Sequence, residues 1–261
     1  MIIVSPGETA FSVFGFSVFW YGIILAVAIL CGVFCAEFLG KKYSAIPSGF
    51  FIDNSPAVIV AGIIGARLYY CLVNFSYYTA KPLEIFDIRQ GGLSIHGMII
   101  AGIITVFFLA EKYKIHVFEL FDVLACSVAL SQSIGRWGNF FNSEAFGLPT
   151  NSGWGLFIPV SHRPVEYLNY ELFHPAFLYE SLADFIIFLI LLLIFKKFKR
   201  GYVFFAYLIL YSAARFAIES IRIDSVLYIS GMPVAKFVSI ITIIAAFGGL
   251  GFLIYHDYNS N

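Results

Sequence analysis

The chain has 261 residues, of which 60% are hydrophobic and 12% charged, and its 16 basic and 16 acidic residues give a formal net charge of zero. This composition excludes an ordinary soluble domain and is typical of an integral membrane protein. The charge balance gives no reason to expect a nucleic-acid partner. All four cysteines lie in apolar segments without the spacing of a disulfide framework or a metal site, so we expect no metal or other cofactor.

Runs of about 20 apolar residues, the length that crosses a bilayer as a helix, recur along the chain. We therefore predict an all-α polytopic membrane protein with about seven transmembrane helices. The first run has no basic segment before it and no small-residue cleavage site after it, so we expect a retained span rather than a signal peptide. The predicted spans are Phe16–Phe38, Ser55–Val73, Gly92–Ala110, Val117–Ile134, Ala176–Phe195, Tyr202–Ile218 and Val234–Tyr255.

Basic residues predict the orientation of the chain, because short cytoplasmic loops are enriched in Lys and Arg. They follow the first, third and fifth predicted spans, which puts the N-terminus outside and the C-terminus in the cytoplasm. Residues 136–175, the one long connection, would then form a small external head of turns and short strands between helices 4 and 5. The basic residues that set this orientation are Lys41, Lys42, Lys112, Lys114, Lys196, Lys197, Lys199 and Arg200.

The segment from Ser133 to Gly147 is unusually polar for this chain and follows the fourth predicted span directly. Ionisable groups at the edge of hydrocarbon are costly and usually mark a site. Glycines let the backbone approach a ligand, and a guanidinium group suits a phosphate. We therefore interpret the segment as an anion-binding turn at a membrane surface. Its polar residues include Arg136, Asn139, Asn142 and Glu144.

A glycine-rich segment, Gly91 to Gly97, opens the third predicted span and places His96 near the outer end of that span. Arg136 is expected at the same membrane face. A histidine in this position either donates a hydrogen bond to a neighbouring carbonyl or takes part in chemistry. Position alone leaves both alternatives open.

The sixth predicted span ends with four polar residues at spacings of four, four and three, which stack on one face of a helix. One interpretation is a structural Arg–Glu pair that locks helices together. The other makes Arg215 a second phosphate ligand that Glu219 holds in place. The four residues are Tyr211, Arg215, Glu219 and Arg222.

Three further positions have both an ordinary and a functional explanation. Tyr21, in Trp20-Tyr21-Gly22, is what an aromatic belt at the membrane interface would place there. Arg67, toward the outer end of the second span, either extends to the interface or binds substrate. The third is the motif from His174 to Glu180, in which Pro175 and Glu180 are typical of the start of a helix, and this explains much of the motif.

Taken together, these segments resemble the prolipoprotein diacylglyceryl transferase family of polytopic bacterial enzymes. The closest resemblance is Gly135 to Gly147, which is similar to the family's signature Gly-Arg-x-Gly-Asn-Phe-x-Asn followed by Glu and Gly. Supporting matches occur in the family's order from the first span to the sixth. They are Trp20-Tyr21-Gly22, Gly65-Ala66-Arg67, Ser94 to Gly97, His174-Pro175 with Leu178-Tyr179-Glu180, and Arg215 with Glu219 and Arg222.

The resemblance implies an enzyme of the bacterial inner membrane that transfers diacylglyceryl from phosphatidylglycerol to the lipobox cysteine of a prolipoprotein. This is the first step of lipoprotein maturation, and it forms a thioether and releases glycerol phosphate. The expected partners are phosphatidylglycerol, lipobox-containing prolipoproteins and membrane lipids. The expected catalytic residues are His96, Arg136 and Arg215, and the expected substrate-binding residues are Tyr21, Arg67, Asn139, Asn142, Glu144, Gly147, Glu219 and Arg222.

The chemistry that this reaction needs fits those residue types. A thiol with a reference pKa of about 8.5 must become a thiolate before it attacks carbon, so a base such as His96 is useful. Negative charge grows on the phosphate as it leaves, and Arg136 and Arg215 are suited to stabilise it. Glu144 and Glu219 are expected to orient these arginines.

Two hypotheses, each from a different functional class, compete with the hypothesis of an enzyme. In an anion transporter or channel, the arginines and the histidine would line a path, but such charges usually lie at the bilayer midplane on broken helices. An assembly scaffold without activity would leave His96 and the arginines unexplained. The gathering of charges near the outer ends of the spans favours chemistry at the membrane surface.

Overall fold

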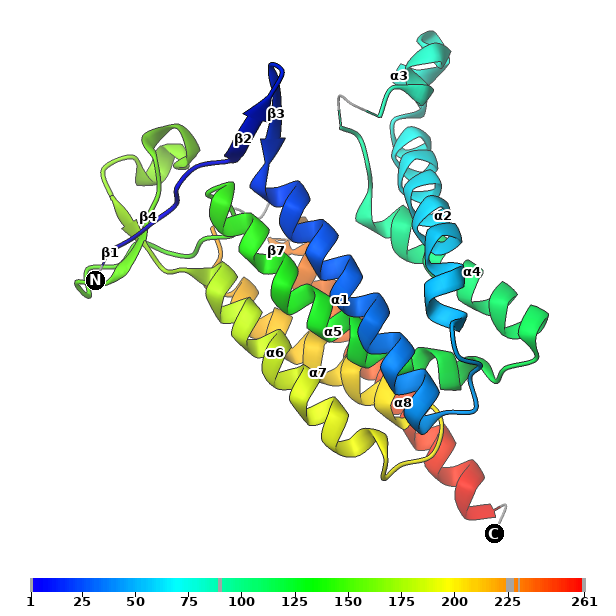
Figure 1. Ribbon diagram of the computed structural model, residues 1–261. Coiled ribbons are helices and arrows are strands. Elements are labelled where there is room, and N and C mark those ends of the chain that lie inside the picture. The colour runs from blue at the N-terminus through cyan, green and yellow to red at the C-terminus, as the bar shows by residue number, and fades with distance from the viewer. Residues whose placement is uncertain (1, 89–90, 224–227, 230, 260–261) are drawn as a thin grey trace. The chain divides into compact units, whose positions relative to one another are not determined.

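The computed structural model describes residues 2–88, 91–223, 228–229 and 231–259 (Figure 1). Within these residues, seven helices are long and apolar enough to cross a membrane, which confirms the predicted all-α polytopic architecture. The seven helices are α1 (Trp20–Tyr43), α2 (Phe50–Val73), α4 (Ile95–Tyr113), α5 (Val117–Phe141), α6 (Ala176–Phe195), α7 (Tyr202–Glu219) and α8 (Val234–Asn259). Shorter helices are α3 (Phe75–Ala80), η1 (Pro82–Phe86), η2 (Val160–His162) and η3 (Val165–Tyr167).

The chain divides into two compact units, and the division falls within α1 and within α5. The first unit comprises Met1–Cys35 and Asp122–Asn261, and it contains α6, α7 and α8. The second unit comprises Ala36–Phe121, and it contains α2, α3, η1 and α4.

In the second unit, α2 and α4 pack closely because glycines face each other across the helix pair. A Cβ on Gly97 would overlap the carbonyl oxygen of Gly65, and a Cβ on Gly65 would overlap Ala101. Small residues that let two backbones approach are the usual way in which membrane helices associate, since lipid provides no hydrophobic drive between them. The α2–α4 contact therefore depends on the absence of side chains at these two positions.

In the first unit, α6, α7 and α8 lie side by side in chain order (Figure 1). The N-terminus of α7 is fixed by Asp122 of α5, whose buried carboxylate accepts hydrogen bonds from the backbone N–H groups of Gly201, at 2.6 Å, and Phe204, at 2.7 Å. A carboxylate at this end of a helix satisfies N–H groups that have no partner within the helix and complements the helix dipole.

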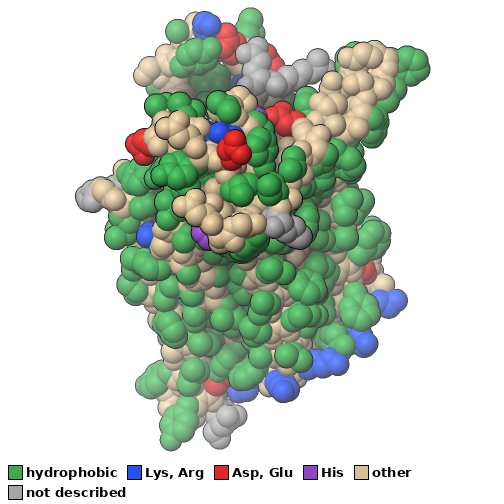
Figure 2. Space-filling model, turned by 90° about the vertical axis from the view of Figure 1, so that its left-hand side faces the viewer, with side chains coloured by type: hydrophobic (Ala, Val, Ile, Leu, Met, Phe, Trp, Pro, Cys, Tyr) green, Lys and Arg blue, Asp and Glu red, His purple; other side chains and the backbone are tan. Residues whose placement is uncertain are grey.

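Hydrophobic side chains cover most of the helix surface that Figure 2 shows. Large apolar residues such as Leu193, Ile244 and Phe252 are more than 65% exposed, and only 11% of the membrane-spanning window of α8 is buried inside the protein. A soluble protein would not leave such a surface to water, whereas lipid covers it without cost.

The connection between α5 and α6 contains turns and short strands. Strand β4 (Gly155–Phe157) pairs antiparallel with β5 (Leu172–Phe173). The N-terminal strand β1 (Ile2–Val4) completes this sheet by pairing parallel with β4, a pairing that no sequence pattern predicts. The sheet covers a small core of buried residues, which are Ala145, Phe146, Leu156, Ile158, Phe173 and Phe177.

The first span begins later than predicted, because Phe16–Phe19 is strand β3 rather than helix. It pairs antiparallel with β2 (Thr9–Val13) across a turn at Phe14 and Gly15, both of which have positive φ. Two central residues with positive φ are characteristic of tight hairpin turns, so local turn geometry outweighs the apolar character of this segment. Ahead of α8, β6 (Tyr228–Ile229) pairs antiparallel with β7 (Met232–Pro233).

Helix α5 continues seven residues beyond the predicted end at Ile134 and stops at Phe141. The prediction of a turn at Arg136 is therefore wrong, because Arg136 and Asn139 lie on the last turns of a helix. The connection to α6 accordingly begins after Phe141 rather than at residue 136. The chain leaves the helix at Ser143, which has a φ of 53°.

The glycine contact between α2 and α4 predicts the effect of adding one methyl group. Gly97→Ala should lower the melting temperature in detergent, by the equivalent of about 1–3 kcal/mol, because its Cβ has no room. Gly102→Ala on the same helix is the matched control, since a Cβ there meets nothing within 4 Å, and it should be neutral or stabilising. Equal melting temperatures for the two variants would contradict this packing.

Candidate functional site

Six charged side chains form what we call the arginine–carboxylate cluster in the first unit. They come from α5, α6, α7 and the segment that follows α7, and their formal charges balance, with three arginines and three carboxylates. The members are Arg136, Glu180, Asp184, Arg215, Glu219 and Arg222.

Glu180 is the residue on which all three arginines converge. Its carboxylate, 4% exposed, lies 3.0 Å from Nε of Arg136 through Oε2, and Oε1 accepts a hydrogen bond from Nη1 of Arg215. Nη1 of Arg222 lies 3.9 Å from the same Oε1. One buried carboxylate thus joins α6 to α5, to α7 and to the chain beyond α7.

Arg215 and Arg136 use their donors differently. Arg215 is paired through both terminal nitrogens, with Glu180 through Nη1 and with Glu219 through Nη2 at 2.7 Å. The predicted Arg215–Glu219 pair is therefore confirmed. Arg136 contacts Glu180 and Asp184 through Nε alone, and no described residue pairs with its two terminal nitrogens. Arg136 consequently keeps the donors that bind an anion in a two-pronged manner.

The cluster is electrostatically demanding, because moving charges out of water costs several kcal/mol per ion. That cost is offset only when each charge has a close partner of opposite sign. The side chains of Glu180, Asp184 and Glu219 are each 3–4% exposed, and those of the arginines 14–21%. Removal of one member would leave an uncompensated charge in an apolar environment.

The end of α5 presents the other polar residues of the predicted signature. Glu144 is exposed and accepts long hydrogen bonds of 3.4 Å from the side-chain amides of Asn139 and Asn142. The described contacts give no support to the expectation that Glu144 orients an arginine, since the carboxylates beside Arg136 are Glu180 and Asp184. Ser143 and Ala145, on either side of Glu144, both have positive φ. Such strain in residues other than glycine is concentrated at functional sites.

Gly147 lies where three segments meet. Its N–H donates to the carbonyl of His174 at 2.8 Å, and it pairs as an isolated bridge with Arg222. A Cβ at Gly147 would lie 3.0 Å from both His174 and the carbonyl oxygen of Ile221, so a side chain would press on the segment that carries Arg222. Arg222 itself lies beyond the end of α7 at Glu219, which corrects the expectation that it shares a helix face with Arg215.

Tyr21, near the start of α1, packs against Gly138 of α5, where a Cβ would lie 2.7 Å from the tyrosine ring. Tyr21 and Asn142 both line a groove of about 590 Å³. Apolar side chains and small residues form most of its wall, together with one acidic residue. The other lining residues are Glu8, Val18, Phe19, Gly22, Ile23 and Ala26.

In the second unit, His96 is the second residue of α4, so it lies at the end of the helix where the sequence predicts it. Its side chain is exposed, and its ring lies 5.9 Å from the ring of Tyr69 on α2. Within the described residues the His96 ring has no hydrogen-bond partner, so the alternative of a carbonyl-bound histidine gains no support.

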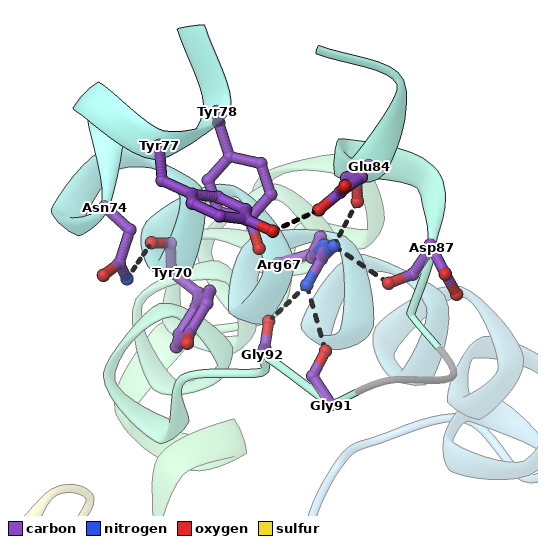
Figure 3. A pocket seen from close by; sticks show the side chains of 9 residues that line it. All are labelled: Arg67, Tyr70, Asn74, Tyr77, Tyr78, Glu84, Asp87, Gly91 and Gly92. Atoms are coloured by element: carbon purple, nitrogen blue, oxygen red, sulfur yellow. Dashed lines mark hydrogen bonds between the residues drawn. The ribbon is translucent and has the colours of Figure 1, made fainter. Parts of the chain in front are cut away.

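Arg67 of α2 is 7% exposed and lines a cavity of about 300 Å³ together with three tyrosines (Figure 3). At its rim, Tyr77 donates a hydrogen bond to Glu84, and Glu84 pairs with Lys81 at 3.0 Å. The hydrogen bond from Tyr77 and the neighbouring Lys81 lower the pKa of Glu84, and the hydrogen bond to Glu84 raises the pKa of Lys81. This ion pair therefore stays charged at neutral pH.

Glu180 and Asp184 are the site residues that sequence reasoning missed. The start-of-helix explanation for Glu180 is incomplete, because its carboxylate is buried among arginines rather than exposed at the helix end. The sequence does contain a pattern that indicates them: two acidic residues, four positions apart, occur in the apolar segment Ala176–Phe195, which has no basic residue. Intramembrane acids of this kind need a cationic partner elsewhere in the chain.

The first unit therefore contains most of the predicted residues. His96 and Arg67 belong to the second unit, so the prediction that His96 and the arginines face one substrate stays a prediction. The members found in the first unit are Tyr21, Arg136, Asn139, Asn142, Glu144, Gly147, Arg215, Glu219 and Arg222.

Within the described residues, seven helices that are long and apolar enough to cross a membrane and, in the first unit, a buried arginine–carboxylate cluster define a multi-pass membrane protein with a candidate anion site. Residues 8–252 match the profile of the prolipoprotein diacylglyceryl transferase family, and the chain belongs to this family. It is 40% identical to a phosphatidylglycerol–prolipoprotein diacylglyceryl transferase of Prochlorococcus marinus (strain MIT 9301), over 98% of this chain and 95% of that protein. Proteins of the same name from Synechococcus sp. (strain CC9902) and Nostoc sp. (strain PCC 7120) are 42% and 39% identical, over 90% and 97% of this chain and 85% and 91% of theirs.

The position of Glu180 predicts a large effect on stability from a nearly isosteric change. Glu180→Gln removes the charge that compensates the arginines and should lower the free energy of unfolding by about 3–5 kcal/mol, measured by thermal unfolding in detergent. Glu166→Gln, at an exposed position in η3, is the control and should change it by less than about 0.5 kcal/mol. If both variants melt like the wild type, the cluster does not hold the helices together.

Proposed function

We propose that the protein transfers the diacylglyceryl group of phosphatidylglycerol to the thiol of the lipobox cysteine of a prolipoprotein. The products are a thioether-linked diacylglyceryl prolipoprotein and glycerol phosphate, and the reaction is the first step of bacterial lipoprotein maturation. Membership of the family over nearly the whole chain supports this reaction and class of enzyme.

The observation that carries the proposal is the difference between Arg136 and Arg215. Arg136 is held by buried carboxylates through Nε, which leaves its terminal nitrogens available for a phosphate. Arg215 is paired through both of its terminal nitrogens, with Glu180 and with Glu219, so its role is to hold the cluster and add positive charge beside the phosphate. Preorganised donors in a site of low dielectric are the strongest means of stabilising a charge that develops as a bond breaks.

The reaction balances with these groups in place. The thiol gives its proton to a base, for which we propose His96, and the thiolate sulfur attacks the glyceryl carbon that is bonded to the phosphate oxygen. A carbon–sulfur bond forms as the carbon–oxygen bond breaks, and the electron pair leaves with glycerol phosphate. Arg136 donates hydrogen bonds to the phosphate oxygens while their charge grows.

The groove beside Tyr21 and Asn142 suits the lipid. A volume of about 590 Å³ lies in the range of small-molecule sites, and its apolar wall fits the glyceryl group and the first part of the acyl chains. Asn139, Asn142 and Glu144 provide donors and acceptors for glycerol hydroxyls. Gly147 and Arg222 contribute through the bridge that joins them, and Glu219 orients Arg215.

The same proposal places the protein in the bacterial inner membrane, with its N-terminus outside, its C-terminus in the cytoplasm and its site toward the outer face. Basic residues in the last turn of α1 and α4 support this orientation. Phosphatidylglycerol and a secreted precursor meet at that face. An anion transporter would not need the acceptor thiol, so an assay of lipid transfer to a thiol separates the two functions.

The direct test is to incubate the purified protein in detergent with labelled phosphatidylglycerol and a lipobox peptide, and to measure lipid on the cysteine. The wild type should transfer the label, and Arg136→Ala should reduce turnover roughly 100- to 1,000-fold because it removes the phosphate donors. Arg200→Ala, at an exposed arginine between α6 and α7, is the control and should retain activity. No transfer by folded wild-type protein would refute the enzyme, and full activity of Arg136→Ala would refute its role.

A second measurement tests the base. His96→Asn should lower turnover and shift the pH dependence of turnover to higher pH. Without the base, the reaction depends on spontaneous ionisation of the acceptor thiol, which has a reference pKa of about 8.5. His256→Asn, in the last turn of α8, should keep the wild-type profile. An unchanged pH–rate profile for His96→Asn would exclude His96 as the base.

A further inference from the structure

Arg67 has all five of its N–H donors occupied by backbone carbonyls of one loop. Nε donates to Ile85 at 2.8 Å, Nη1 to Gly91 and Gly92 at 3.0 Å each, and Nη2 to Glu84 at 2.5 Å and Asp87 at 2.9 Å. We call residues 84–88 and 91–94 the Arg67 loop. Figure 3 shows the guanidinium group at its centre, with carbonyls of the loop around it.

This geometry leaves Arg67 without donors for a phosphate. A guanidinium group has five N–H donors in a fixed fork, and a substrate would have to break part of the loop to reach one. The side chain is 7% exposed, and the ring of Tyr78 lies 5.2 Å from the centre of its guanidinium group. Buried carbonyls need partners as much as a buried arginine does, so the arrangement satisfies both.

The contacts continue from the Arg67 loop to the start of α4. Ser94 donates its N–H to the carbonyl of Ala66 at 3.0 Å, next to Arg67 on α2. Gly97 then packs against Gly65. Three successive residues of α2 thus hold the chain immediately before and after His96.

Gly92, which belongs to the Arg67 loop, occupies a position that requires glycine. Its φ of +74° disfavours any residue with a side chain, and a Cβ there would overlap Nη1 of Arg67. Gly91 has a similar φ of +86°, but a Cβ there would meet nothing within 4 Å. Positive φ favours glycine at both positions. Only at Gly92 would a side chain also collide with the guanidinium group of Arg67.

From these contacts we infer that Arg67 is a positioning residue for His96 rather than a substrate ligand. By holding the Arg67 loop through five carbonyls, it sets where α4 begins and therefore where the imidazole of His96 points. This inference rests on the proposed function, because it gives the loop the task of placing the base. A displacement of about 1 Å at such a group is enough to cost two orders of magnitude in rate.

Arg67→Lys separates a positioning residue from a phosphate ligand. An ammonium group keeps the charge and remains a good phosphate binder, but it has three donors and cannot hold five carbonyls. In the transfer assay, Arg67→Lys should lower kcat roughly 10- to 100-fold with KM for phosphatidylglycerol within about twofold of the wild type. Retained kcat with a raised KM, or full activity, would identify a ligand and overturn the inference.

Gly92→Ala disturbs the contact between Arg67 and the loop without altering the arginine. It therefore tests the inference even if Arg67→Lys does not fold. It should lower kcat more than Gly91→Ala, since both carry the strain of positive φ and only the former displaces Arg67. Tyr77→Phe, which removes the hydrogen bond to the Glu84 side chain at the rim, should leave kcat unchanged. Equal effects of the two glycine variants would overturn the inference.

Backbone hydrogen exchange tests the loop independently of turnover. Amides of residues 91–96 should exchange faster in Arg67→Lys and Gly92→Ala than in the wild type and in Tyr77→Phe, because opening of the loop exposes them. If the wild type shows no transfer, the proposed function fails, while faster exchange still supports the loop contact. Unchanged exchange in Arg67→Lys would refute the contact even in an active enzyme.

Discussion

The packing of the first unit depends on the pairing of six charged side chains, five of them on apolar helices and the sixth, Arg222, just beyond the end of α7. Charges that leave water must meet opposite charges at close range, since the cost of desolvation otherwise exceeds any gain from packing. Glu180 meets this requirement for three arginines at once, so the relative placement of α5, α6 and α7 is set by one carboxylate. The same contact determines the direction in which Arg136 points. Stability and the geometry of the candidate site therefore have a common origin.

Hydropathy predicts the membrane spans well, because a run of about 20 apolar residues has few alternatives to a spanning helix. The span Ala176–Phe195 has the same bounds in the sequence analysis and in the structure. The predicted span boundaries are wrong where hydrogen bonds or ion pairs, rather than hydropathy, determine where a helix begins or ends. Phe16–Phe19 is apolar but pairs with its neighbour across a tight turn, and α5 continues to Phe141 because Arg136, beyond the predicted end of the span, pairs with Glu180 of α6. Hydropathy contains neither kind of information.

The candidate site was predictable in its residue types and only partly in its contacts. An arginine in an apolar segment is conspicuous in a sequence, so Arg136 and Arg215 were found. Their shared partner Glu180 lies 35 residues from Arg215 along the chain, and such a distant pair follows from the packing of helices rather than from a local pattern. The Arg215–Glu219 pair was foreseen because a spacing of four residues brings two side chains together on any helix.

Arg67 and Arg136 are stabilised in two different ways, and the difference separates their roles. Arg67 is surrounded by neutral carbonyls that use every donor, so its contacts hold a loop and leave nothing for a ligand. Arg136 is balanced by carboxylates at one nitrogen and keeps its terminal donors, so its charge is stabilised before any anion arrives. A phosphate needs donors as well as positive charge. The number of donors that remain, rather than the presence of an arginine at a membrane face, is therefore what distinguishes a ligand from an anchor.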